Sequence, residues 1–179
     1  MNTKFNEMET DMQEATTAQV LGPDEGPVGR LGAMGVRFMV DAGASGGGFS
    51  LVEHPIAPRG LAAPLHRHTH EDEYSFVLEG HIGARLGDDT VYAQAGDLIF
   101  KPRGQWHTFW NAGDEPARIL EIIAPGGFES YFEQMSELLA DGTLPDPARV
   151  GAIAEAHGLE VDIASMVSLC AEHGLNLGL

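Results

Sequence analysis

Apolar and polar residues alternate through much of the first 125 residues, and this pattern predicts β-strands. Val36, Phe38 and Val40, for example, alternate with Arg37 and Met39, which is the two-residue period of an extended chain with one buried face. Short segments of this kind are separated by turns that contain glycine or proline. We expect strands at residues 30–40, 49–56, 74–78, 81–86, 91–93, 98–101 and 117–124, with a further strand starting at residue 65.

One of these predicted strands, at residues 74–78, is apolar on both of its faces. Glu73 and Val77 should point into the interior, while Phe76 and Leu78 should point outward. A strand that is apolar on both faces has to be covered on both. We therefore expect a second sheet or the terminal helices to cover its outer face.

The hydrophobic period changes from two to about 3.6 after Gly127, which predicts a helical C-terminal part. The first helix should present one apolar face and end at Gly142. Asp146 and Pro147 suit the N-cap and first turn of a second helix, and Asp162 can cap a third. These helices carry no visible chemistry, and we expect them to cover a sheet or to form a dimer contact.

The stretch with the clearest chemistry is the tract of residues 66–73. His66 and His68 are two residues apart, so in an extended strand both imidazoles point to the same face and can hold one ion. Neutral imidazole is the commonest metal ligand. Glu73 follows after a short polar turn, and His107 comes after a Pro-Arg-Gly turn. Three imidazole nitrogens and one carboxylate oxygen suit a divalent first-row metal with positions left open for water or substrate.

Two spaced motifs contain these four residues. The first is Gly60, five residues, His66-x-His68, four residues, Glu73, six residues and Gly80; the second is Gly96, five residues, Pro102-x-Gly104, two residues, His107, three residues and Asn111. Both match the motifs of the cupins position for position, and the chain resembles this family. The resemblance implies a mainly β fold, a double-stranded β-helix or jelly-roll barrel, in which His66, His68, Glu73 and His107 bind one metal ion. The order of barrel, Gly-Gly-Phe-Glu helix and helical tail is also similar to the quercetin-dioxygenase-like cupins.

The same tract contains an alternative pair of ligands. His70 lies on the same face as His66 and His68, so His68 and His70 could bind the ion instead. The spacing from Gly60 and Gly80 favours His66 and His68. His70 would then lie at the rim, as a hydrogen-bond partner or as a solvated side chain.

The same patterns divide the chain into three parts. Residues 1–26 are mostly polar and are expected to form a flexible N-terminal arm, residues 27–125 the cupin barrel, and residues 126–179 a C-terminal helical extension. The two motifs differ and each occurs once, so we expect one barrel rather than two.

Composition narrows the range of partners. Ten lysines and arginines against 27 aspartates and glutamates give a net charge of −17, so nucleic acid and anionic membranes should be repelled. No run approaches the roughly 20 apolar residues of a membrane span. Cys170 is the only cysteine, which excludes an internal disulfide and fits a reducing cytoplasm. We therefore expect a cytoplasmic protein whose partner is a small molecule.

The resemblance and the ligand set lead to a functional hypothesis. We expect a metal-dependent dioxygenase acting on a small hydroxylated or enolisable organic molecule, with one divalent ion of iron, manganese, nickel, cobalt, copper or zinc. Glu73 can act as a ligand and, when it loosens from the ion, as a general base. The alternatives are a non-catalytic small-molecule-binding cupin and a metal-dependent lyase or isomerase that does not use oxygen. A homodimer is expected by analogy with the family.

Overall fold

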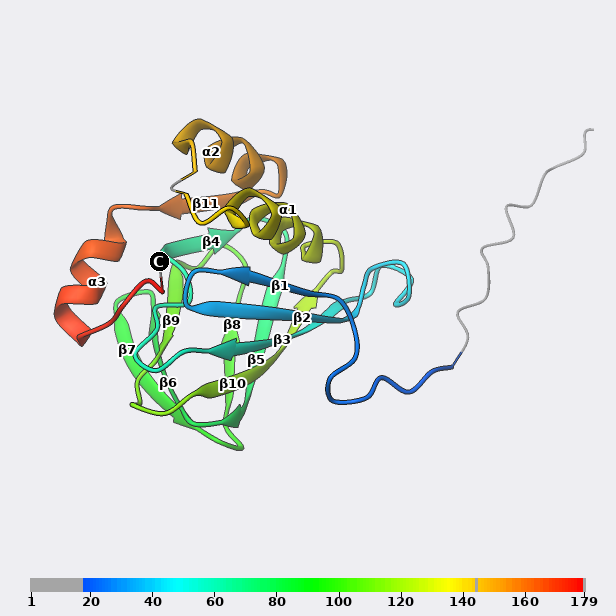
Figure 1. Cartoon of the computed structure of the whole chain (residues 1–179), viewed down its shortest axis with the longest axis horizontal. Helices are drawn as coiled ribbons and strands as arrows, with labels where there is room; N and C mark the ends of the chain where they lie inside the picture. Colours follow the sequence, from blue (N-terminus) through cyan, green and yellow to red (C-terminus); the bar gives the residue numbers. More distant parts are fainter. Residues whose placement is uncertain (1–17, 144, 179) are drawn as a thin grey trace, which may run out of the picture.

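Two antiparallel sheets lie face to face and enclose the main apolar core (Figure 1). The computed structural model describes residues 18–143 and 145–178. One sheet has the strand order β1-β2-β3-β10-β5-β8 and the other β11-β4-β9-β6-β7. The strands are β1 (Val28–Leu31), β2 (Met34–Val40), β3 (Ser50–Ile56), β4 (Leu65–His68), β5 (Asp72–Glu79), β6 (His81–Leu86), β7 (Asp89–Gln94), β8 (Leu98–Lys101), β9 (His107–Asn111), β10 (Ala117–Ala124) and β11 (Leu159–Asp162). The predicted mainly β jelly-roll architecture is confirmed.

Strand β10 shows how the alternation of residues builds the core. Ala117, Ile119 and Ile123 are fully buried, and Glu121 belongs to the same inward-facing row. β10 pairs with β3 on one side and with β5 on the other, so this row lies well inside the six-stranded sheet. The interior therefore contains a carboxylate in the middle of an apolar row.

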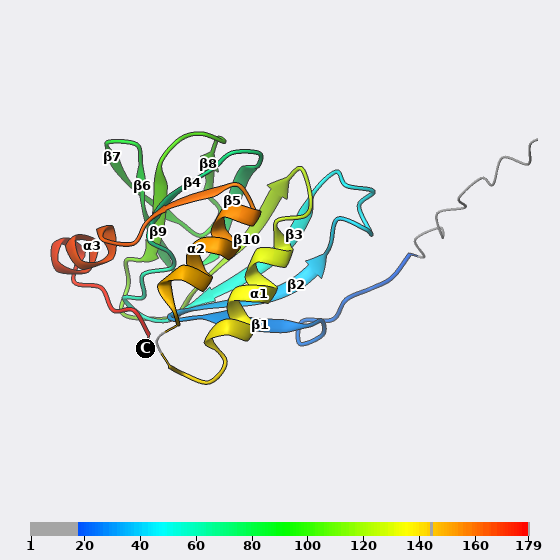
Figure 2. The same ribbon diagram turned by 90° about the horizontal axis from the view of Figure 1, so that it is seen from above.

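Three helices follow the barrel: α1 (Glu129–Leu139), α2 (Pro147–Ala156) and α3 (Ser165–His173). The Asp146 side chain accepts a hydrogen bond from the backbone N–H of Ala148 at 3.0 Å, as expected of an N-cap residue. α1 packs along β1 and lies with α2 on one side of the barrel, whereas α3 lies apart from them (Figure 1, Figure 2). None of these helices has the length and apolar character needed to span a membrane, in the part of the chain that the structure describes.

The predicted C-terminal helical extension contains a strand as well as its helices. Between α2 and α3 the chain forms β11, which pairs antiparallel with β4 and places Leu159 opposite His68 and Val161 opposite His66. Four residues with two apolar positions are too few to reveal a period, but the free edge of β4 offers unpaired backbone groups. The C-terminal extension therefore covers the edge of the strand that carries the two histidines.

The outer face of β5, β8 and β10 differs from the prediction as well. Glu73 and Val77 are buried on the inner face, as expected. Phe76, Leu98 and Phe100, however, are 41%, 59% and 47% exposed among the described residues, so the expected covering of both faces is wrong there. The reason is the placement of α1 and α2, which lie beside β1 and β11 rather than over this face (Figure 1).

A second, smaller apolar cluster attaches α3 to the five-stranded sheet. Trp110 on β9 is 1% exposed and packs with Leu61 and Leu169, while the His173 ring stacks on the indole with ring centres 4.3 Å apart. Gly83 on β6 is paired with Trp110, and a Cβ there would lie 2.3 Å from the indole ring. Glycine at this position therefore makes room for the tryptophan that holds α3.

The N-terminal arm is described only in part. Residues 1–17 lie outside the described residues, so the predicted arm at 1–26 and the domain boundaries stay predictions. In the described portion, the backbone N–H of Gly22 donates to the Glu25 carboxylate at 2.8 Å. Arg37 donates to the Gly22 carbonyl at 3.1 Å, which ties this segment to β2.

Candidate metal centre

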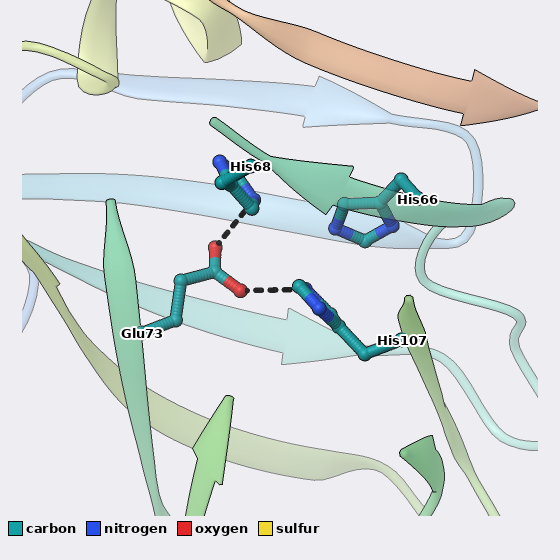
Figure 3. Close-up of side chains that lie close together, drawn as sticks. All are labelled: His66, His68, Glu73 and His107. Carbon is teal, nitrogen blue, oxygen red and sulfur yellow. Dashed lines mark hydrogen bonds and ion pairs between the residues drawn. The ribbon is translucent and has the colours of Figure 1, made fainter. Parts of the chain in front are cut away.

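The four predicted ligand residues come together inside the barrel (Figure 3). β4 contributes His66 and His68, β5 contributes Glu73, and β9 contributes His107. The register of β4 and β9 places His66 directly opposite His107. All four are buried, and one potential ligand atom from each lies within 4.8 Å of the others. The four side chains can therefore reach a single ion.

Backbone carbonyl groups orient two of the imidazoles. His66 Nδ1 donates to the carbonyl of Pro64 at 2.8 Å, and His107 Nδ1 donates to the carbonyl of Gln105 at 3.0 Å. Because a carbonyl oxygen can only accept, each Nδ1 carries a proton. In the neutral ring, Nε2 is then the nitrogen left to bind a metal.

Glu73 lies between two of the imidazoles. Its Oε1 is 3.3 Å from His68 Nε2, and its Oε2 is 3.0 Å from His107 Nε2. With one proton of His107 on Nδ1, the contact between Nε2 and the carboxylate oxygen is favourable when Nε2 binds a cation as well, either a second proton or a metal ion. Among the described residues, moreover, both ring nitrogens of His68 are buried without a hydrogen-bond partner. This donor set fits one divalent transition metal ion.

The electrostatics of the site favour a neutral His66 and an ionised Glu73. Burial, and then repulsion from the neighbouring imidazoles of His107 and His68, hold the pKa of His66 well below its usual value. Burial opposes the ionisation of Glu73, but Lys101 and His68 outweigh it and hold the pKa of this carboxyl well below its usual range. Burial also opposes the charged form of His68, but its carboxylate neighbours raise its pKa to about 9. A metal ion would take the place of the proton on His68.

A second network of buried charges adjoins Glu73. Lys101 Nζ lies 2.8 Å from Glu73 Oε2 and 2.6 Å from Glu121 Oε1. Glu121 also accepts a hydrogen bond from the Ser75 hydroxyl at 2.5 Å, and its Oε2 lies 3.2 Å from His54 Nε2. These residues were not predicted from the sequence. The available signal was a charged residue at an inward-facing position of an apolar strand.

An apolar cavity of about 720 Å³ opens onto the site. His66, Glu73 and Glu121 line its polar end, while the remaining wall is mostly aromatic and aliphatic and includes Phe109 from the barrel and Tyr131 from α1. This volume is typical of small-molecule sites. The cavity therefore suits a molecule with an apolar body and a few oxygen atoms at one end.

Other residues considered from the sequence lie elsewhere. His70 is exposed, and its ring lies against Gly158 rather than among the four ligand side chains. Phe109 is buried and lines the cavity. Trp106 is half-buried, with the Arg67 guanidinium 5.1 Å from its ring centre, and is not among the described residues that line the cavity.

Three buried histidines and one glutamate lie around a common point inside a jelly-roll barrel, which is the arrangement that the resemblance to the cupins implies. Comparison with known proteins agrees, because the model of the family described as "Cupin domain" matches residues 53–123. This segment contains all four candidate ligands. The match and the fold of similar solved structures support the cupin superfamily, while the quercetin-dioxygenase-like group stays a prediction.

Individual relatives cover only parts of the chain. The tetracenomycin polyketide synthase protein TcmJ of Streptomyces glaucescens is 32% identical over 83 residues, which are 46% of this chain and 54% of that protein. Germin-like protein 1 of Brassica napus is 33% identical over 119 residues, 59% of this chain and 57% of that protein. The chain thus spans little more than half the length of these relatives. A solved structure of a predicted oxalate decarboxylase from Thermotoga maritima has a TM-score of 0.56 and 20% identity, covering 60% of this chain and 99% of that one, which shows the fold alone.

Proposed function

We propose that this protein is a metal-dependent oxygenase that acts on a small, mainly apolar molecule with a hydroxyl group or an enolisable carbonyl. The observation that carries the proposal is the convergence of four buried candidate ligand side chains, two of which, His66 and Glu73, line an apolar cavity. His66, His68, Glu73 and His107 would hold the ion. When bound, a divalent metal ion would lower the pKa of a coordinated hydroxyl or enol group and stabilise the resulting anion.

The polar end and the apolar wall of the cavity would bind different parts of the substrate. The polar end accepts the oxygen atoms of the substrate, and Glu73 can take up the proton that a bound hydroxyl or enol loses. The apolar wall excludes water and so strengthens the electrostatic interactions at that end. Burial raises the pKa of Tyr131 to about 12, so its phenol stays neutral at physiological pH and can donate a hydrogen bond to a bound molecule.

One relative fits this choice of substrate. TcmJ carries the name of a polyketide synthase protein, and polyketide chains combine enolisable carbonyl groups with an apolar skeleton. The same likeness favours a second candidate function at the same centre, a lyase or isomerase reaction of an enolisable ketone without oxygen.

Oxygen dependence separates these candidates. We expect protein loaded with Fe²⁺ or another divalent ion to consume oxygen with at least one member of a panel of flavonols, 1,3-diketones and catechols, and to form product only in air. An oxygen electrode and mass spectrometry of the products measure this, with chelator-treated protein as the control. Product formed under nitrogen would support the lyase or isomerase instead. Binding without product in either atmosphere would support a non-catalytic binder.

The proposed base role of Glu73 can be tested by replacing it with glutamine. The amide keeps the size of the side chain and one oxygen ligand but cannot accept the substrate proton, so kcat should fall by about 100-fold or more. Metal content by mass spectrometry and turnover on the same sample provide the measurement. Glu172→Gln is a matched control, because Glu172 is an exposed carboxylate that pairs with Arg85 and lies outside the group of four. Undiminished turnover in a Glu73→Gln protein that keeps its metal would exclude the base role.

A homodimer and a cytoplasmic location both stay predictions. The exposed apolar face formed by β5, β8 and β10 is the kind of surface that protein interfaces bury. A second copy of the chain is the partner that we propose for it, because a two-fold interface needs a self-complementary surface and this region carries both members of the Arg118–Glu79 pair.

A further inference from the structure

Lys101 is a buried cation that contacts the candidate metal centre without belonging to its ligands. It is 1% exposed, and the pairing of β5 with β8 places it directly opposite Glu73. Its ammonium group lies 2.8 Å from Glu73 Oε2, 2.6 Å from Glu121 Oε1 and 4.4 Å from the centre of the Phe109 ring. Two carboxylates and one aromatic face therefore surround the charge.

A buried ion pair is by itself weak evidence that the lysine is there for stability. Removing charges from water is costly, and well-packed apolar residues often replace a buried ion pair without loss of stability. The surroundings nevertheless fix the lysine firmly. Glu121 is itself held by Ser75 and lies beside His54, whose Nδ1 donates to the carbonyl of Gly35 at 2.9 Å. The ammonium group is thus held at one point beside Glu73.

The two oxygens of Glu73 differ because of this contact. Oε2 forms an ion pair with Lys101 at 2.8 Å and also lies 3.0 Å from His107 Nε2, whereas Oε1 lies 3.3 Å from His68 Nε2. A carboxylate oxygen that already interacts with an ammonium group is a poorer donor to a second cation. If Oε2 also bound the metal ion, it would occupy a coordination position that a chelating substrate needs.

We propose that Lys101 is a positioning residue that keeps Glu73 bound to the metal ion through one oxygen, so that a ligand with two donor oxygens can chelate the ion. The inference rests on the proposed metal site. In an octahedral shell, three imidazoles and one carboxylate oxygen leave two positions open, whereas a carboxylate bound through both oxygens leaves one. Lys101 thereby selects catechol-like and 1,3-diketone-like ligands over ligands with a single donor atom.

Cobalt-loaded protein provides a test that does not depend on turnover. Two probes are titrated into it and followed by visible absorption: 4-nitrocatechol, which binds through two oxygens, and azide, which binds through one atom. In Lys101→Met with cobalt in excess we expect one bound ion per chain, an affinity for 4-nitrocatechol lower by about tenfold or more, which is about 1.4 kcal/mol, and an affinity for azide within about twofold of that of the unmodified protein.

Two further variants control for misfolding and for the loss of one positive charge. Lys101→Met leaves Glu121 buried without its cation, so the double variant Lys101→Met with Glu121→Gln removes both charges and should fold if the single variant does not. Arg118→Met is the matched control, because it removes one positive charge from a side chain on the outer face of β10 that pairs with Glu53 and Glu79. It should leave both affinities unchanged.

The possible outcomes are distinct. Equal losses for 4-nitrocatechol and azide, or unchanged affinities for both, in a variant that keeps its cobalt would overturn the role of Lys101 and leave the proposed metal site intact. Failure of the unmodified protein to bind cobalt, zinc or iron would refute the metal site itself and this inference with it. Selective loss of 4-nitrocatechol would support the inference.

Discussion

Replacing His107 with alanine is expected to remove the metal ion from the purified protein and to reduce turnover to background. His107 is 1% exposed and is the candidate ligand that β9 contributes, opposite His66 on β4. Substitutions of groups that merely orient a ligand typically cost about 10- to 100-fold in metal affinity, so loss of a ligand should cost about 100-fold or more. The measurement is the number of metal ions per chain after dialysis against a weak chelator.

His70→Ala is the matched control for this experiment. His70 belongs to the same histidine tract, but it is exposed and lies against Gly158, so its removal should leave the metal content unchanged. The opposite result, with the ion lost in His70→Ala and kept in His107→Ala, would make His68 and His70 the ligand pair. The ligand set proposed here would then be wrong.

The convergence of the four candidate ligands could be predicted because each step depends on a local rule. The parity of a strand places His66 and His68 on one face, and the two motif spacings bring Glu73 and His107 to the same place through the likeness to cupins. The mainly β fold follows in the same way from the two-residue alternation of apolar and polar positions. The C-terminal helices follow from the change of hydrophobic period after residue 127.

The buried charge network could not be predicted in this way, because it depends on register between strands that are distant in the sequence. Lys101 meets Glu73 only through the pairing of β8 with β5, and Glu121 meets Ser75 only through the pairing of β10 with β5. Each charged residue by itself looks like an exception in an apolar strand. Strand β11 was missed for a related reason, since its four residues gain their partner from the edge of β4.

The candidate ligands and part of the cavity wall come from different parts of the chain. The segment that matches the cupin domain ends at residue 123, and it contains every candidate ligand. Tyr131 and Phe132 on α1 and Val150 on α2 line the cavity from outside that segment, where the two helices lie together beside the barrel (Figure 2). Relatives with the same ligands but another C-terminal segment should therefore accept other substrates.

Replacing Trp110 with alanine should lower the free energy of unfolding by about 3–5 kcal/mol, the usual cost of truncating a buried aromatic side chain. Trp110 is 1% exposed, lies between the five-stranded sheet and α3, and stacks on His173. The indole is thus the main apolar contact between α3 and the barrel, and its loss leaves a cavity that Gly83, with no side chain, cannot fill. Urea denaturation followed by circular dichroism measures the change.

Trp106→Ala provides the comparison within the same protein, because the chain has two tryptophans. Trp106 is half-buried and contacts Arg67 through its ring face, an interaction that contributes about 1 kcal/mol or less. Trp110→Ala should also make α3 more susceptible to proteolysis, whereas Trp106→Ala should not. Similar losses of stability in the two variants, with α3 equally protected, would show that packing elsewhere holds α3 and that the indole at position 110 does not anchor it.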